Sequence, residues 1–243
     1  MKTKKSKIKE RVPTGITNFD KLIKGGFEKN STNLVVGGAG SGKTIFAAEF
    51  LVGGMKRGEK CLYITFEEKK PEFYQNMLEV GINLAEYEKN GLLVFLEYSP
   101  LKVKTMLEEG GGIIETIVLE KKISRIVIDS ITSFSLLFKD KLSQREASLS
   151  LFNMISKWNA TSLLTLEEDP LIRQENISKD LEFETDSIVV FYYVRNKNER
   201  QRYIEVKKMR GTRHSKKIYN FEITEKGITI GKKPASNIPK EIL

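Results

Sequence analysis

The stretch Gly37–Thr44 constrains the fold most, because its letters GGAGSGKT fit G-x-x-x-x-G-K-[ST] at every defined position. The apolar run Leu34–Val36 precedes it and the run Ile45–Leu51 follows, so it lies between an expected strand and an expected helix. Glycines let the loop point successive N–H groups at phosphate oxygens, and the helix N-terminus adds partial positive charge. The structural alternative is a glycine-rich turn with a chance Lys-Thr pair. The context favours phosphate binding, so we predict that the chain binds a nucleoside triphosphate.

The residues of this loop have distinct expected roles. We expect Lys43 to reach the β- and γ-phosphates and the Thr44 hydroxyl to ligate Mg²⁺. The residues expected to contact the nucleotide are Gly38, Ala39, Gly40, Ser41, Gly42, Lys43, Thr44 and Ile45. Asp129 ends the apolar run that begins at Arg125, which places it at the carboxyl edge of the sheet, where ligands of α/β sheets bind. Such a run is common by itself, but beside a complete phosphate loop it predicts a second Mg²⁺ ligand, acting through water.

Hydrolysis also needs a residue that orients or activates water, and the candidates are Glu67 and Glu68. They follow the expected strand Cys61–Phe66 and should reach the same sheet edge as the phosphate loop. A carboxylate within hydrogen-bonding reach of the attacking water can act as a general base. Glutamates are also favourable near helix N-termini for structural reasons, but that role does not require two of them. We therefore predict a catalytic role, and favour Glu67 because it is nearer the strand end.

Strand-like and helix-like segments alternate along most of the chain, which predicts an α/β fold with a mostly parallel central sheet flanked by helices. The expected strands are 32–36, 61–66, 92–96, 125–128 and 162–166. The expected helices are 43–57, 71–80, 142–158 and 103–122, the last interrupted by Gly110–Gly112. Later strands, expected at 188–194, 202–208, 217–223 and 228–230, have short polar connections. They predict a C-terminal antiparallel β extension on the sheet edge.

The composition suits a globular protein. A chain of 243 residues fits one large α/β domain and can bury a substantial core. The longest apolar runs are of strand length, far short of the ~20 residues that span a bilayer, and no apolar signal region follows the basic N-terminus. We therefore expect a cytoplasmic protein without membrane insertion. The lone Cys61 leaves no disulfide and no Cys-based metal site, so a buried structural thiol is expected.

The chain is basic, with 41 Lys and Arg against 32 Asp and Glu and a net charge of +9. One basic segment, Met1–Arg11, is interpreted first as a disordered tail and second as an arm for nucleic acid. The other, Arg195–Lys217, contains only Glu199 and Glu205 as acidic residues. On charge alone its lysines would be interpreted as a solvated strand edge that deters aggregation.

Taken in order, these motifs resemble the KaiC branch of the RecA-like ATPases. The resemblance begins with PTGITNFD at 13–20 and GGF at 25–27, and it includes the phosphate loop. It continues through TFEE at 65–68, VIDS at 127–130 and SLLT at 162–165, and ends with KMRGTRH at 208–214. It implies a single RecA-like P-loop NTPase domain at 12–231, between a basic tail at 1–11 and a C-terminal tail at 232–243. It also implies ATP hydrolysis in a hexameric ring, with Mg-ATP at subunit interfaces, acting as a nucleotide-driven regulatory switch for a partner protein.

The resemblance gives the second basic segment a role. In this family the segment approaches the nucleotide held by the next subunit, so Lys208 and Arg210 are implied to supply charge at a neighbour's γ-phosphate. By the same match, Met209, His214 and Lys216 are expected close to that nucleotide. His214 is the only histidine, and without partner ligands we do not expect it to bind a metal.

Departures from the family limit what can be carried over. The circadian clock protein has two such domains in tandem and autophosphorylates a Ser-Thr pair, where this chain has Glu182 and Phe183. We therefore do not expect clock phosphorylation, although Thr185 and Ser187 are alternative acceptors. The alternative function is a DNA-binding ATPase of recombinase or helicase type, with few aromatic residues for base stacking. Its candidate basic residues are Lys139, Lys141, Arg145, Arg173 and Lys179. A nucleotide-binding scaffold with little turnover is a third reading, disfavoured by the intact acidic residues.

Overall fold

The computed structural model describes residues 9–99, 101–102, 105, 112–135, 137–138, 140–172, 181 and 183–242. Several residues named above lie outside these ranges, namely residues 1–8 of the basic tail, Gly110, Gly111, Lys139, Arg173, Lys179 and Glu182. The side chain of Lys141 is also outside the description.

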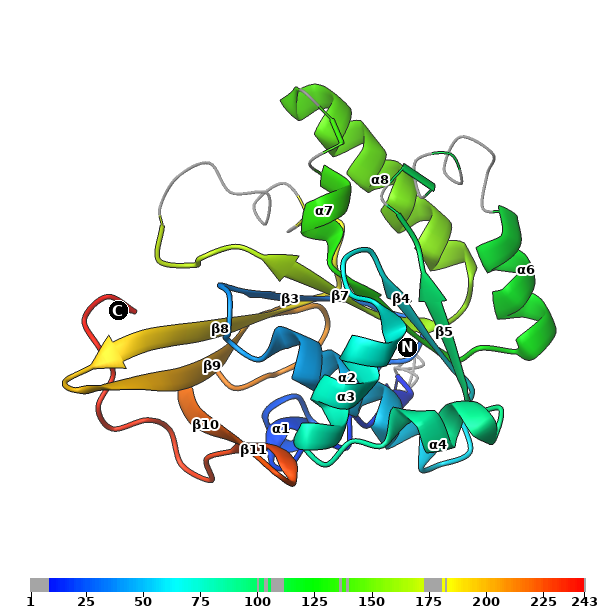
Figure 1. Cartoon of the computed structure of the whole chain (residues 1–243). Coiled ribbons are helices and arrows are strands. Elements are labelled where there is room, and N and C mark those ends of the chain that lie inside the picture. Colours follow the sequence, from blue (N-terminus) through cyan, green and yellow to red (C-terminus); the bar gives the residue numbers. More distant parts are fainter. Residues whose placement is uncertain are drawn as a thin grey trace, which may run out of the picture.

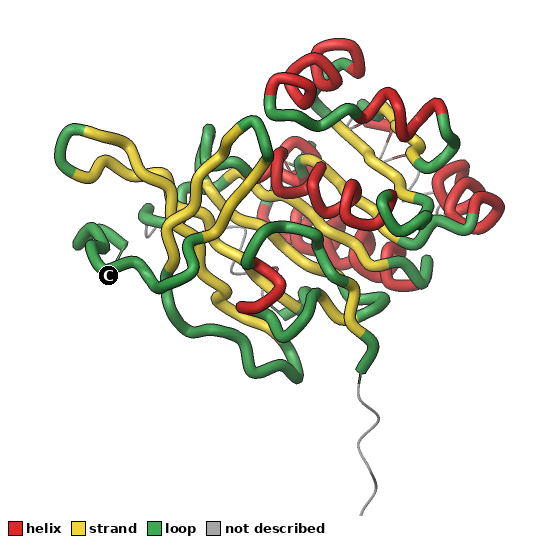
Figure 2. Tube along the Cα trace, turned by 90° about the horizontal axis from the view of Figure 1, so that it is seen from below, coloured by secondary structure: helices red, strands yellow, loops and turns green. Residues whose placement is uncertain are grey.

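A nine-stranded sheet has the order β11-β10-β9-β8-β3-β7-β6-β4-β5. Its parallel strands are β3 (Thr32–Gly37), β4 (Cys61–Thr65), β5 (Leu93–Glu97), β6 (Arg125–Asp129), β7 (Thr161–Glu167) and β8 (Ser187–Asn196). The strands β9 (Glu199–Met209), β10 (Tyr219–Thr224) and β11 (Gly227–Ile230) continue the sheet in antiparallel order. The β8–β9 hairpin extends beyond the helices (Figures 1 and 2). The predicted parallel core with a C-terminal antiparallel extension is confirmed.

Helices cover both faces of the parallel part of the sheet (Figure 1). One face carries α2 (Lys43–Met55), α3 (Lys70–Glu79) and α4 (Leu84–Lys89), and the other carries α6 (Gly112–Lys121), α7 (Ile131–Ser135) and α8 (Lys141–Lys157). Each face therefore has its own apolar core, because strands covered on both sides bury nearly every side chain. None of the helices in the described ranges is long and apolar enough to cross a membrane.

The element boundaries differ from the sequence expectations in ways that local bonding explains. Helix α2 ends at Met55, not at Arg57, because the N–H groups of Arg57 and Gly58 bond three residues back and tighten the last turn. Strand β9 begins at Glu199, three residues early, because Lys197 adopts φ 57° and closes a tight hairpin. Some short elements have no readable period in the sequence and were not predicted, namely α4, α7, α1 (Phe19–Leu22), β1 (Arg11–Val12) and β2 (Phe27–Glu28).

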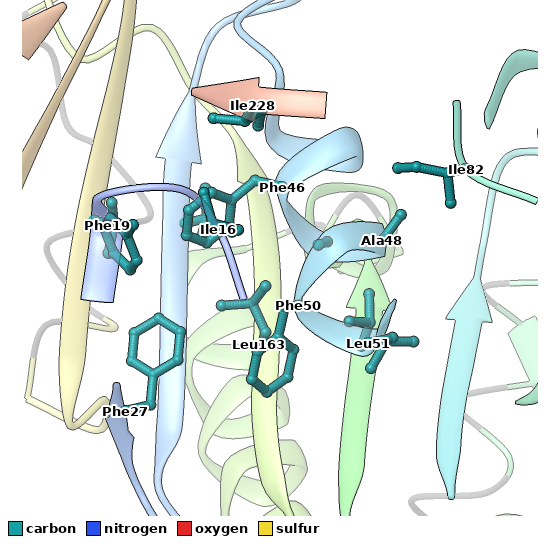
Figure 3. Packing of buried hydrophobic residues seen from close by; sticks show 14 of the residues in the cluster. Ile16, Phe19, Phe27, Phe46, Ala48, Phe50, Leu51, Ile82, Leu163 and Ile228 are labelled. Atoms are coloured by element: carbon teal, nitrogen blue, oxygen red, sulfur yellow. The ribbon is translucent and has the colours of Figure 1, made fainter. Parts of the chain in front are cut away.

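Aromatic side chains fasten the N-terminal segment to the helix that follows the phosphate loop (Figure 3). Phe19 meets Phe46 edge-on with ring centroids 4.9 Å apart, and Phe27 meets Phe50 in the same way at 5.8 Å. All four rings are fully buried. Such edge-to-face pairs add about 0.5–1.5 kcal/mol each beyond their area burial. The packing fixes α2, and with it the loop at its N-terminus.

Arg125 provides a polar anchor inside this packing, although its position in an apolar run gave no hint of it. The guanidinium is completely buried and makes two hydrogen bonds, at 2.7 and 2.8 Å, to the Glu59 carboxylate. It also donates to the carbonyls of Pro13 and Phe50. Burial tends to raise the pKa of Glu59, but the hydrogen bonds and charge of Arg125, together with the Ser124 hydroxyl and the charge of Arg57, outweigh it and hold that pKa below its usual value. A buried charge paired this completely joins the N-terminal segment, α2 and β6.

Candidate functional site

A cavity of about 350 Å³ opens at the carboxyl ends of the parallel strands, between the phosphate loop and the antiparallel extension. The structure brings together there several of the sequence-predicted residues, namely Gly40, Gly42, Lys43, Thr44, Ile45, Glu67, Glu68 and Asp129. They come from the ends of β4 and β6, from the loop between β3 and α2, and from the start of α2. Parallel strands deliver their C-terminal residues to one edge, which is why segments far apart in sequence converge.

The phosphate loop has the backbone that its glycines were expected to allow. Gly42 has φ 103° and caps α2, whose first i→i−4 bond runs from the Phe46 N–H to the Gly42 carbonyl at 3.0 Å. A side chain at Gly42 would also meet the Ile223 side chain at 2.9 Å. Only glycine satisfies both the left-handed backbone and this close approach. The first turn of α2 therefore begins at the cavity, and Lys43, Thr44 and Ile45 line it.

Lys43 carries its charge into an enclosed position. Its side chain is 7% exposed, and Nζ donates to the Gly38 carbonyl at 2.9 Å and lies 3.8 Å from Glu167. Burial lowers the pKa of Lys43, and Glu167, Asp129 and Glu67 oppose this by favouring the ammonium form. An ammonium ion so poorly solvated gains more from an added phosphate than a surface lysine would.

Asp129 is held rigidly at the end of β6. Its carboxylate accepts hydrogen bonds from the Tyr63 hydroxyl at 2.7 Å and from Thr165. Burial, and then the Asp129 charge, raise the pKa of Tyr63, so this hydroxyl stays a donor. Asp129 and the Thr44 hydroxyl line the same cavity and are the oxygen ligands that Mg²⁺ prefers. Within the described ranges no group of three or more His, Cys, Asp or Glu lies together as a metal ion would need.

Glu67 and Glu68 line the cavity in different environments. Glu67 Oε1 accepts from the Ser130 hydroxyl at 2.9 Å and from Ser133, both on the segment that follows β6. Within the described ranges the Glu68 carboxylate has no such hydrogen bond, and its pKa is raised by burial and then by the charges of Asp129, Glu67 and Glu72. One glutamate is thus oriented by two hydroxyl groups, and its neighbour has an increased affinity for a proton. Both properties suit water activation.

Three further residues line the cavity, Arg202, Glu167 and Ile223, and no sequence motif predicted them. Arg202 Nε and Nη2 donate to the Gly40 carbonyl at 3.2 and 3.1 Å, and its guanidinium lies 4.3 Å from the centre of the Tyr193 ring. The extension thereby adds a second cation to the phosphate loop of its own chain. The basic character of residues 195–217 was the only signal for Arg202, and nothing in that stretch distinguished it from its neighbours.

The structure does not bring the second basic motif to the phosphate loop of its own chain. Lys208 pairs with Ile188 in the sheet, and Ile188 pairs with Leu34, three residues before Gly37. That separation is about 10 Å along the strands. Lys208 Nζ donates to the Thr185 carbonyl at 2.6 Å.

The rest of this motif lies at the same distant edge of the sheet. Arg210 is about half exposed, lies 3.7 Å from Asp186 and donates to the Phe183 carbonyl. Met209 is buried in the core, His214 Nδ1 lies 2.8 Å from the Ser215 carbonyl, and Lys216 is exposed. Within one chain, these residues and the cavity form separate groups.

Comparisons with known proteins identify the family of the chain. A family model described as ATPase, KaiC, matches residues 12–235. The chain is 34% identical over 229 residues to the circadian clock protein KaiC3 of Synechocystis, covering 91% of this chain but 45% of that protein. It therefore spans about half the length of the circadian relatives it matches. It is 33% identical to a UPF0273 protein of Methanopyrus kandleri, covering 91% of this chain and 92% of that protein.

A solved structure is similar over almost the whole chain. The crystal structure of a KaiC-like protein from the hyperthermophilic archaeon Pyrococcus horikoshii has a TM-score of 0.81 and 33% identity, covering 92% of this chain and all of that one. Sequence, fold and the order of motifs therefore agree. The chain belongs to the KaiC family of RecA-like ATPases.

Proposed function

We propose that the chain binds Mg-ATP in the phosphate-loop cavity and hydrolyses it. The observation that carries this proposal is the convergence on one cavity of Lys43, Thr44, Asp129 and the Glu67–Glu68 pair. Lys43 and the N–H groups at the start of α2 supply positive charge for the β- and γ-phosphates. Thr44 and Asp129 would hold Mg²⁺, which neutralises phosphate charge when bound. Triphosphate binding and charge stabilisation are the main requirements of phosphoryl transfer.

Water activation falls to the two glutamates. Glu67 is our candidate base because Ser130 and Ser133 occupy its Oε1 and leave Oε2 for the attacking water. Glu68 lies beside it with a raised pKa, so it can take over a proton or hold the water. Burial lowers the pKa of Lys43, and the charges of Glu167, Asp129 and Glu67 favour its ammonium form, which is the form that pairs with phosphate.

We further propose that the active form is a homohexameric ring in which Lys208 and Arg210 act on the nucleotide of a neighbouring subunit. Their position away from the phosphate loop of their own chain supports this, since a cation there can serve catalysis only in trans. The ion pair of Arg210 with Asp186 is half exposed, and such pairs are worth about 0–1 kcal/mol, so a phosphate can displace it readily. The placement of His214 and Lys216 near the nucleotide is part of the same proposal.

Mixed rings test this proposal. Lys43→Ala subunits should fail to bind ATP tightly, and Arg210→Ala subunits should bind it but hydrolyse it slowly. Mixing them creates interfaces with an intact phosphate loop on one side and an intact Arg210 on the other. Activity above the sum of the two separate preparations is expected. If mixed rings form, as shown by mass spectrometry, and remain inactive, the trans role of Arg210 is wrong.

The biological role proposed is a cytoplasmic regulatory switch in which hydrolysis changes the ring for a protein partner. The alternative DNA-binding role depends on the net charge of +9 and on basic residues that lie largely outside the described ranges. Salt titration separates the two. Binding to single- or double-stranded DNA that weakens steeply with salt indicates several phosphate contacts and favours the alternative.

A further inference from the structure

Glu49 is a half-buried residue whose carboxylate neither the phosphate loop nor the catalytic pair explains. It lies on α2, six residues after Lys43, and its Oε1 accepts the main-chain N–H of Ile228 on β11 at 2.9 Å. Its other oxygen, Oε2, is buried and has no hydrogen-bond partner among the described residues. The carboxylate therefore joins the P-loop helix to the C-terminal hairpin through one oxygen and leaves the other unsatisfied.

The hairpin is shaped to receive this carboxylate. A side chain at Gly227 would begin 1.5 Å from Glu49 Oε1, so the contact needs a glycine there, and Gly227 also has φ 85°. Ile228 pairs directly with Ile223 across the hairpin, and the Ile223 side chain covers Gly42 and lines the phosphate-loop cavity. A continuous path therefore runs from Glu49 through Ile228 and Ile223 to the nucleotide site.

The surroundings of Glu49 favour its neutral form. Burial raises the pKa of Glu49 to about 7, against the opposing effects of the Ile228 N–H and of Lys56. Glu49 also lines a second cavity of about 500 Å³ between α2, the α3–α4 turn and the β10–β11 turn. The titratable and charged groups facing it there are Lys56, Glu86, Tyr87, Glu225 and Lys226. The charges of the two glutamates and the two lysines balance one another. Among the described residues, no ion pair is made by the second oxygen of Glu49.

We propose that Glu49 is a proton-dependent positioning residue: its neutral form fastens the β10–β11 hairpin, and so Ile223, to the P-loop helix, and its ionisation loosens them. The sign follows from the preference for the neutral form. The bond from the Ile228 N–H by itself favours the ionised form, but burial of the carboxylate outweighs it, so the hairpin is held most firmly in mild acid and less firmly as the pH rises towards and through neutrality. Ionised Glu49 turns towards Lys56 and the water of the second cavity, which leaves the Ile228 N–H without its acceptor. The expected effect on nucleotide affinity rests on the proposed ATP site, whereas the effect on the hairpin does not. The test therefore measures hairpin protection and nucleotide affinity separately.

Glu49→Gln provides the decisive variant, since it keeps an acceptor for the Ile228 N–H but cannot ionise. Glu222→Gln removes a charge from an exposed site on the same hairpin and is the matched control. Amide hydrogen exchange of residues 219–230 is measured without nucleotide at pH 6.0, 7.0 and 8.5, as the ratio of each variant to wild type. Between pH 6.0 and 8.5, we expect the protection of the wild-type hairpin, divided by that of the Glu49→Gln hairpin, to fall at least threefold. Glu222→Gln should behave like wild type.

Affinity for a fluorescent ATP analogue is measured over the same pH range. We expect the wild-type affinity to weaken at least threefold with rising pH and the Glu49→Gln affinity to stay nearly constant. Failure of the analogue to bind at any pH contradicts the proposed function. The exchange experiment still tests the role of Glu49 in that case, because it is done without nucleotide. If the exchange ratio of Glu49→Gln to wild type is independent of pH, Glu49 is not a proton-dependent positioning residue.

Discussion

Replacement of Lys43 by methionine should separate fold stability from ligand binding. The side chain is 7% exposed and its pKa is lowered chiefly by burial, so the ammonium ion is poorly solvated in the free protein. Methionine keeps most of the buried chain length without the charge. Removing the poorly solvated charge favours the folded state. Removing the cation that faces Glu167, Asp129 and Glu67 disfavours it, so the two effects oppose each other. We expect the free variant to melt within a few degrees of wild type.

The response to ATP should differ strongly. Charge-assisted hydrogen bonds contribute about 1.5–3 kcal/mol each, so losing those of Lys43 to the β- and γ-phosphates costs at least about 3 kcal/mol, or ~100-fold in Kd. Ligand at 100 times the wild-type Kd stabilises the wild type by about 2.7 kcal/mol, but the variant by only about 0.4 kcal/mol. In a protein of this size, about 2–4 °C per kcal/mol converts the missing stabilisation to about 5–9 °C in Tm.

Differential scanning fluorimetry with and without Mg-ATP measures this difference. Lys89→Met serves as the control, because Lys89 is an exposed lysine at the end of α4, outside the cavity. A Lys43→Met protein that is folded without ligand, yet shows the full wild-type shift with Mg-ATP, would refute the assignment of Lys43 to the phosphates.

Three further predictions follow from other contacts. Glu67→Gln combined with Glu68→Gln should retain ATP but lose about 10²–10⁴-fold in hydrolysis rate, and near-normal single-turnover rates would show that water is activated elsewhere. Arg202→Ala should weaken ATP binding about tenfold, the effect of one charge-assisted bond, as measured by calorimetry; unchanged affinity would limit Arg202 to bracing the Gly40 carbonyl. The depressed pKa of Glu59 means that its ionised form stabilises the fold above about pH 4.5, and this stabilisation is lost as the pH falls further. Glu59→Gln should therefore cost about 3–5 kcal/mol of unfolding free energy at pH 7 and make stability less dependent on pH in the acid range, as measured by urea unfolding.

The sequence was informative wherever the chemistry is local. The phosphate loop carries its roles within one contiguous stretch, and both the Glu67–Glu68 pair and Asp129 follow apolar runs that predict strands. Parallel strands place such residues at one edge whatever their order, so their convergence in the cavity could be expected in advance. The change from parallel to antiparallel strands could also be predicted from sequence. Short connections can join only antiparallel neighbours, whereas parallel neighbours need a long crossover.

Contacts between distant segments could not be predicted in this way. Arg202 faces the Gly40 carbonyl only because β8 and β9 extend the sheet beside β3, and no local pattern marks one arginine of a basic strand as facing the loop. Arg125 and Glu49 are likewise polar residues in otherwise apolar settings, whose partners come from other elements. Sequence alone therefore determined the type of chemistry and the class of fold, since these depend on short patterns and periodicity. Only the tertiary structure decided which charges are buried, which partners satisfy them and which cations reach the nucleotide site of the same chain, because burial and distance belong to the packed molecule.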